Sequence, residues 1–280
     1  MSTDLATKYL PYVDEQFTTE SKLSLITNKD FDFTGAKTVK VYKVNTSAMN
    51  DYDRDGEGKF QNSRYGNIAN LTGSTEEFIL SKNAEPSFKN LYGFPGCACI
   101  SVNDVLIHGI PDKNIILKEG DIVSIDLGAK YKGYNGDNTK TFAVGEISEE
   151  ISRLLKVTEE SLLLGIEKAV VGNRVSDISG AVQKYCESNG YSIVKEYTGH
   201  GVGKQLHEDP SVPNYKTGVR GPRLEHGMTI AIEPMVNMGS DRVISDPDGW
   251  NVKSADGLPN AHFEHTVAIT DNGPEILTLP

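Results

Sequence analysis

The chain has 280 residues, of which 38% are hydrophobic and 24% carry charged side chains. This balance is typical of a globular protein with one large domain or two small ones. Lys and Arg number 28 against 39 Asp and Glu, and the resulting net charge of −11 disfavours binding to nucleic acid through its phosphates. No apolar run approaches the ~18–20 residues of a membrane span, and the N-terminus lacks the pattern of a secretory signal.

The character of the sequence changes near residue 83. Residues 1–83 are polar, with an alternating apolar pattern at 37–44 that predicts a strand and a further candidate strand at 75–81. Residues 49–67 contain no aliphatic side chains apart from Met49, which predicts an exposed loop or a disordered segment. We therefore divide the chain into an atypical N-terminal segment, residues 1–83, and a domain that comprises residues 84–280.

Residues 84–280 carry the pattern of an α+β domain with antiparallel strands. A buried strand at 120–131 and an alternating strand at 138–145 predict a hairpin. Amphipathic helices are expected at 148–172, with Ser148 as the N-cap, and at 176–190. Further strands are expected at 191–197, 226–234 and 261–271.

The cysteines indicate where the protein works. There are three of them, Cys97, Cys99 and Cys186, and the first two stand too close in sequence for an easy bridge. A small, odd number of cysteines indicates free thiols in a reducing compartment. We therefore expect a cytoplasmic protein.

Acidic residues stand inside predicted apolar strands. They are Asp126 in IVSIDLG, Glu233 in TIAIEPM and Glu264 in AHFEHTVAI. A buried carboxylate is costly unless it pairs with a cation or binds a metal. A buried ion pair with Arg or Lys is the ordinary explanation for any one of them. The ion-pair explanation is weaker here, because three strands each contain such an acid and none of them has Arg or Lys in its apolar core.

Asp137 and His200 extend this set of candidate ligands. The predicted hairpin would bring Asp137 back beside Asp126, and the glycines around His200 let the backbone pass close to a ligand or form an ordinary turn. Two Asp, two Glu and one His suit two hard or borderline divalent ions bridged by carboxylates. Two metal ions bridged in this way activate a water molecule that lies between them.

The remaining histidines divide into two groups. His108, before a Gly-Ile-Pro turn, and His207, in QLHEDP, are candidates for contact with substrate, although packing or surface roles are equally open for each alone. His265 is adjacent to Glu264 and points to the opposite strand face. Structural roles are expected for three histidines: His226, His262 and His265.

Six motifs resemble, in order, those of the type I (bacterial-type) methionine aminopeptidases. They are SVNDVLIHGIPD (101–112), GDIVSIDLG with YNGDNTKTF (120–142), GHGVGKQLHEDPSVPNY (199–215), GMTIAIEPMVN (227–237), DGWNVKSADG (248–257) and AHFEHTVAITDNGPEILT (261–278). The resemblance covers residues ~84–280. It implies the pita-bread fold, a curved antiparallel sheet with helices on its outer face and a metal site in the central cleft.

The resemblance also implies a role for each candidate ligand. Asp126 would chelate one metal, whereas Asp137 and Glu264 would bridge two divalent ions, which Co, Mn, Fe or Zn could all supply. His200 and Glu233 would complete the coordination of the other metal. Glu233 would also act as general base for a water that bridges the metals.

The substrate contacts are implied in the same way. His108 and His207 would flank the scissile peptide and stabilise its developing oxyanion or position the amide. Phe94, Cys99 and Trp250 match positions that line the methionine pocket of the family, and an aromatic and thiol-lined slot suits a thioether. From the residues alone, plain core packing is the simpler explanation of these three.

The implied function is removal of N-terminal methionine from nascent proteins and peptides with a small second residue. The expected protein is a monomer that acts on these N-termini at the ribosome, with neither nucleic acid nor membrane as partner. A related X-Pro peptidase with the same ligands is one alternative. An inactive chimeric or capsid-derived protein is another, because residues 1–83 resemble the N-terminal segment of a tailed-phage major capsid protein and lack the two leading helices of the family.

Overall fold

The computed structural model describes residues 20–21, 39–40 and 68–279. Most of the capsid-like segment, including the loop predicted at 49–67, lies outside these residues. Of the strand predicted at 37–44, only β2 (Val39–Lys40) is described, and it pairs antiparallel with β1 (Glu20–Ser21).

The first half of the fold is built on a long antiparallel hairpin. Strand β6 (Ile122–Tyr131) turns into β7 (Tyr134–Ala143) through Lys132 and Gly133. Both turn residues have positive φ, 50° and 88°, as in a type I′ turn, which matches the twist of the strands it joins. The predicted hairpin is confirmed. Strands β3 (Glu85–Pro86) and β4 (Cys99–Val102) pair with the other edge of β6.

The second half is a five-stranded antiparallel sheet in the order β10-β9-β11-β16-β17. Its strands are β9 (Gly199–Gly201), β10 (Glu208–Val212), β11 (Thr229–Ile232), β16 (His265–Thr270) and β17 (Gly273–Ile276). Three smaller strands form a sheet in the order β15-β12-β8, namely β8 (Ser192–Ile193), β12 (Met235–Asn237) and β15 (Asn260–His262). A last sheet contains β5 (Val105–Ile107), β13 (Val243–Ser245) and β14 (Val252–Ser254).

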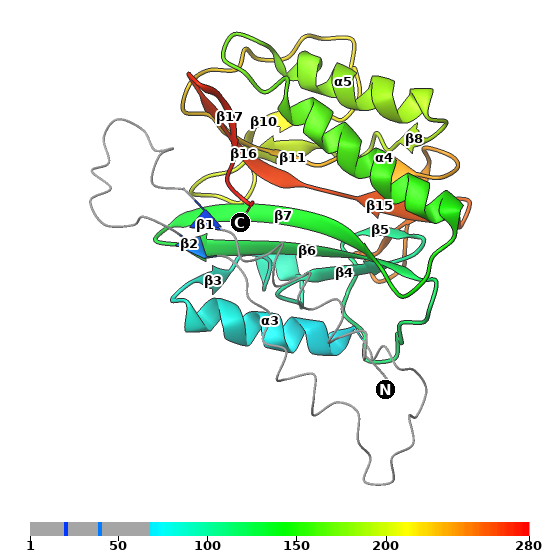
Figure 1. Ribbon diagram of the computed structural model, residues 1–280. Helices are drawn as coiled ribbons and strands as arrows, with labels where there is room; N and C mark the ends of the chain where they lie inside the picture. The colour runs from blue at the N-terminus through cyan, green and yellow to red at the C-terminus, as the bar shows by residue number, and fades with distance from the viewer. Residues whose placement is uncertain (1–19, 22–38, 41–67, 280) are drawn as a thin grey trace, which may run out of the picture.

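Helices lie on the outside of both halves (Figure 1). Helix α4 (Glu149–Ile166) begins at Ser148, whose hydroxyl accepts a hydrogen bond from the Ile151 N–H at 3.2 Å, so the predicted N-cap is confirmed. Its buried face packs with that of α5 (Val175–Ser188) over the second half. Helix α3 (Ala69–Ser81) lies on the far side of the hairpin, and a single 3-10 turn, η3 (Leu91–Gly93), follows it.

The prediction of a strand at 75–81 is wrong, because these residues form the last turns of α3. The short apolar run Phe-Ile-Leu fits either a strand or a helix, and periodicity cannot decide at this length. Packing decides: Thr75 and Ile79, one helical turn apart, are buried, while Leu80 is 53% exposed. Ile79 belongs to the core of the β6–β7 sheet, so this helix packs with the domain predicted to begin at residue 84.

Two predicted strands are each interrupted at an acidic residue. The strand expected at 226–234 stops at Ile232, and β12 starts at Met235, so Glu233 lies at the break beside Pro234, which has no N–H for a ladder. The strand expected at 261–271 is divided between β15 and β16, which leaves Glu264 between them. Within the described residues, no helix has the length and apolarity that a membrane crossing needs.

The packing of α3 gives a first prediction. Ile79→Ala should lower the free energy of unfolding by about 2–5 kcal/mol, because a buried side chain is lost and a cavity is left behind. Leu80→Ala, one residue away and exposed, should change it by no more than about 0.5 kcal/mol. Urea unfolding of the two variants makes the comparison. Equal small effects would mean that α3 adds nothing to the core.

Candidate active site

The β6–β7 hairpin positions the first two acids. Asp126 stands opposite Thr139 in the ladder, and Asp137 stands opposite Gly128. Because Asp137 and Thr139 are two residues apart, their side chains leave the same face of β7, which is also the face of Asp126. The expectation that the hairpin brings the two carboxylates to one place is confirmed.

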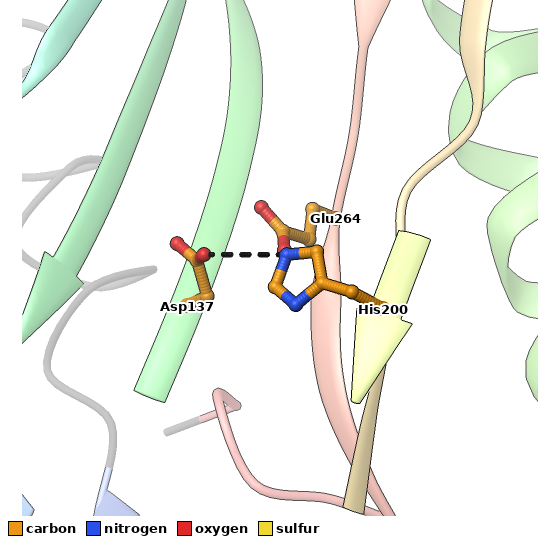
Figure 2. A group of neighbouring side chains, drawn as sticks. All are labelled: Asp137, His200 and Glu264. Carbon is orange, nitrogen blue, oxygen red and sulfur yellow. Dashed lines mark ion pairs between the residues drawn. The ribbon is translucent and has the colours of Figure 1, made fainter. Parts of the chain in front are cut away.

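His200 lies in β9 with one ring nitrogen anchored and the other turned toward the acids (Figure 2). Its Nδ1 is 2.9 Å from the Gly201 carbonyl oxygen, which can only accept, so Nδ1 carries the proton and Nε2 keeps its lone pair. Nε2 lies 3.8 Å from Asp137 Oδ2 and 3.5 Å from Glu233 Oε1. An imidazole held in this way is the usual form of a metal-binding histidine.

The glycines beside His200 serve close packing of the backbone. A Cβ at Gly199 would lie 2.3 Å from the carbonyl oxygen of Ala231, and one at Gly201 would lie 2.3 Å from that of Asp209. Neither contact is possible, so both positions require glycine. The ring of His200 is thereby brought close to the neighbouring strands.

Glu264 joins the two halves of the site. Its carboxylate oxygen Oε2 accepts a hydrogen bond from the Thr139 hydroxyl at 2.8 Å, and its N–H donates to the Thr139 carbonyl at 2.8 Å. The ligand atoms of Asp137, His200 and Glu264 all lie within 4.8 Å of one another. Figure 2 shows the three side chains turned toward one another. Three of the five predicted ligands therefore converge on one point from three separate strands or strand ends.

Burial of the acids makes their ionised forms costly. It raises the pKa of Asp126 to about 6. Burial and the neighbouring carboxylates raise the pKa values of Asp137, Glu233 and Glu264 well above the ordinary range. Burial has the opposite effect on His200, whose pKa falls to about 4, so that the imidazole is neutral at neutral pH.

The donor atoms fit divalent cations. Asp126 Oδ1 and Glu264 Oε1 are buried and have no hydrogen-bond partner among the described residues. The ion pairs that site acids make within this part of the chain are to the histidines His200 and His262. Carboxylate oxygens that lack partners and repel one another, with one nitrogen lone pair nearby, form a site for a cation.

The acids and the predicted methionine slot line the same cavity, whose volume is about 390 Å³. Phe94 and Trp250 meet edge to face with ring centroids 5.1 Å apart. Cys99 stands opposite Asp126 in the β4–β6 ladder, and burial raises the pKa of its thiol well above the ordinary value. The slot is therefore apolar, and the thiol in it is neutral.

The two candidate substrate histidines lie at the same cavity. His108 follows β5 with a positive φ of 57° and meets Tyr197 edge to face, with centroids 5.8 Å apart. His207 precedes β10, and its ring lies edge to face with His200 at 4.5 Å. Burial lowers the pKa of His108 to about 4 and lowers that of His207 as well, so both rings are neutral N–H donors at neutral pH.

Sequence reasoning missed one histidine of this site. His262, to which we assigned a structural role, lines the cavity, and its Nε2 lies 3.3 Å from Glu233 Oε2. The signal was available, because His262 and Glu264 are two residues apart and so share a face of an extended chain. His265 and His226 behave as expected: the first contacts Asn138 and Thr278, and the second pairs with an aspartate at the surface.

Comparison with known proteins was made by sequence and by structure. A model of metallopeptidase family M24 matches residues 69–271. The methionine aminopeptidase of Clostridium acetobutylicum is 56% identical over 211 residues, which are 75% of this chain and 84% of that protein. Methionine aminopeptidase 1 of Bacillus subtilis is 54% identical over 203 residues, 72% of this chain and 80% of that protein.

Solved structures agree with the sequence relatives. The methionine aminopeptidase of Thermotoga maritima gives a TM-score of 0.75 at 44% identity, over 76% of this chain and 86% of that one. The prolidase of Pyrococcus furiosus gives 0.60 at 28% identity, over 76% of this chain and 56% of that one. Fold and site together define a metal-dependent peptidase with the predicted α+β, pita-bread architecture. The chain belongs to metallopeptidase family M24.

The raised carboxyl pKa values predict how metal binding depends on pH. Without metal, the fold loses stability as pH rises through these raised values, since the folded state must give up protons that the unfolded state has already released. A bound divalent ion needs the ionised carboxylates, so protons compete with it at lower pH. The rise in melting temperature on adding Mn²⁺ should therefore be larger at about pH 7.5 than at about pH 5.5.

The chelated protein at each pH is the reference for this measurement. Taking the difference between loaded and chelated protein removes the contribution of groups remote from the site. A manganese-induced shift that is the same at both pH values would contradict the assignment of these carboxyls as metal ligands.

Proposed function

We propose that this protein removes N-terminal methionine from peptides and nascent proteins whose second residue is small. The observation that carries the proposal is the shared cavity, which is lined both by the cluster of Asp137, His200 and Glu264 and by the apolar slot of Phe94 and Trp250. Curated relatives that share 54–56% of aligned residues over most of their length are methionine aminopeptidases, which supports the same activity here.

The proposed cofactor is a pair of divalent metal ions. Its ligands would be five residues of the cavity wall: Asp126, Asp137, His200, Glu233 and Glu264. Two features support a pair, since the set has more oxygen donors than one ion of this kind requires, and two buried oxygens in it lack partners. Mn, Fe, Co and Zn all accept such ligands, so availability would decide which is bound.

The residues around the slot would select and orient the substrate. The thioether of an N-terminal methionine would lie against the rings of Phe94 and Trp250 and the sulfur of Cys99. This contact would place the first peptide bond beside the acids. The slot lines only part of a cavity of about 390 Å³ that also holds the acids and histidines, so the second residue would lie outside the slot.

The chemistry would be hydrolysis of the first peptide bond. Bound divalent ions supply a water of lowered pKa and polarise the scissile carbonyl. Glu233 would take a proton from the attacking water, and the raised pKa of its buried carboxyl suits a base. His108 and His207 would each donate an N–H to the developing oxyanion or to the amide.

The alternatives have weaker support. The prolidase from Pyrococcus furiosus shares the fold, but this chain matches only 56% of its length at 28% identity. Inactivity of a chimeric chain is disfavoured because all five candidate ligands and both candidate substrate histidines line one cavity. We also propose a monomer that works in the cytoplasm on nascent chains at the ribosome. The three buried cysteines form no disulfide in the described part of the chain, which supports a reducing compartment.

The capsid-like origin of residues 1–83 belongs to the same proposal. Its support is the sequence resemblance, and the family match begins at residue 69, so it concerns the residues before that point. Helix α3 packs with the core of the peptidase domain. Both the start of the family match and the packing of α3 lie before residue 83, and the boundary at residue 83 itself stays a prediction.

The activity is tested with short peptides. The chain with added Mn²⁺ should release methionine from Met-Ala-Ser and should leave Ala-Pro-Ser intact. Exhaustive chelation should abolish the release, and divalent metal should restore it, because the acids need a cation to act. Cleavage of Ala-Pro-Ser in preference to Met-Ala-Ser would establish the X-Pro alternative, and activity that survives chelation would exclude the metal mechanism.

The two histidines that meet edge to face should behave differently. His207→Ala should lower kcat about 10²–10³-fold through loss of one transition-state donor, with metal content near that of the wild type. His200→Ala should lose metal as well as turnover. Metal analysis of both purified variants distinguishes the roles, and an empty site in His207→Ala would make it a ligand rather than a donor to substrate.

A further inference from the structure

His262 lines the cavity, and its ring is neither one of the five proposed metal ligands nor one of the two proposed substrate contacts. The side chain is 2% exposed, and Nε2 has no hydrogen-bond partner among the described residues. Nε2 lies 3.3 Å from Oε2 of Glu233, which is within ion-pair distance. A buried polar atom without a partner is costly, so its place in the site needs a reason.

Glu233 lies between two imidazoles. Its Oε1 is 3.5 Å from His200 Nε2, and its Oε2 is 3.3 Å from His262 Nε2. Asn214 donates to the main-chain carbonyl of Glu233 at 2.9 Å, which fixes the backbone but leaves the carboxylate free to rotate. The orientation of the carboxylate is therefore set by what faces its two oxygens.

The backbone holds His262 in a fixed position. Its N–H donates to the Thr141 hydroxyl oxygen at 3.0 Å, and that hydroxyl donates back to the His262 carbonyl at 2.8 Å. On the other side, His262 stands opposite Met235 in the β15–β12 ladder, two residues from Glu233. These contacts fix the backbone of His262 from both sides, so the ring enters the cavity from a defined position.

The proton of the ring belongs on the nitrogen that faces Glu233. Nε2 is the ring nitrogen that lies 3.3 Å from Glu233 Oε2, and it is buried with no hydrogen-bond partner among the described residues. A lone pair on Nε2 would face a carboxylate oxygen and repel it, whereas an N–H would attract it. The Nε2–H tautomer is the favoured one.

We propose that His262 is a positioning residue that holds Glu233 by donating its Nε2–H to Oε2, so that Oε1 stays turned toward His200 and the acid cluster. The proposal rests on the proposed function, in which Glu233 is a ligand and base. A free carboxylate would sample other rotamers, and each loss of orientation would reduce both metal affinity and turnover.

Two substitutions separate donation from packing. His262→Gln keeps a neutral N–H donor of similar reach, whereas His262→Leu keeps apolar bulk and has no donor. For His262→Leu, kcat on Met-Ala-Ser and the affinity for Mn²⁺ should each fall about 10–100-fold, with KM little changed. His262→Gln should stay near the wild type in both measurements. His226→Leu, at an exposed histidine remote from the cavity, is the control.

The measurements are steady-state kinetics and calorimetric titration with Mn²⁺. Wild-type kcat and metal affinity in His262→Leu would overturn the proposal, and so would equal losses in His262→Leu and His262→Gln, since these indicate packing alone. If His262→Leu fails to fold, His262→Met, which is unbranched and also lacks a donor, replaces it. If the wild type leaves Met-Ala-Ser intact, the proposed function fails, and the metal titration still decides the role of His262.

Discussion

Mutual repulsion among buried carboxylates is the constraint on which the site depends. Asp126, Asp137, Glu233 and Glu264 line one cavity, and burial raises the pKa of each, with neighbouring carboxylates adding to the rise at the last three. Such an arrangement is unfavourable for a protein without cations, because desolvation acts on all four acids and like charge adds to it at Asp137, Glu233 and Glu264. The surrounding polar groups orient the acids rather than neutralise them, as the Thr139 hydroxyl does for Glu264. The sequence therefore tolerates a locally costly cluster for the sake of what it binds.

The strand architecture makes this cluster possible. Alternation along β6 and β7 places Asp126 and Asp137 on one face, while the breaks at Glu233 and Glu264 release two side chains from the regular ladder. The glycines beside His200 allow the backbone approach that no larger residue could make. Histidines then fill the space around the acids, neutral because burial lowers their pKa values. Rigid strands thus fix the distances that the proposed chemistry needs.

Much of this could be predicted from the sequence, for identifiable reasons. Asp126 was recognisable because it interrupts an apolar run, and the hairpin because a buried strand at 120–131 is followed by an alternating one at 138–145. The N-cap of α4 followed from Ser148 and the glutamates after it. Residues 75–81 misled because a three-residue apolar run has no clear period, and only packing against the hairpin selected the helix. His262 was missed although its spacing to Glu264 was a signal, because its closest contact is with Glu233, which is distant in sequence and lies near it through the β12–β15 pairing.

The hydrogen bonds that join the two halves span very long stretches of chain. The Thr266 hydroxyl bonds to the backbone of Asp137 across 129 residues, and Thr139 reaches Glu264 across 125. Closing a loop of this length carries an entropic cost, and such a contact cannot form before both of its strands have been synthesised. During synthesis, the β6–β7 hairpin, with its two aspartates, therefore lacks its contacts to Glu264 and Thr266 until β16 has left the ribosome. Metal capture is consequently tied to completion of the chain, and a truncated translation product would lack it.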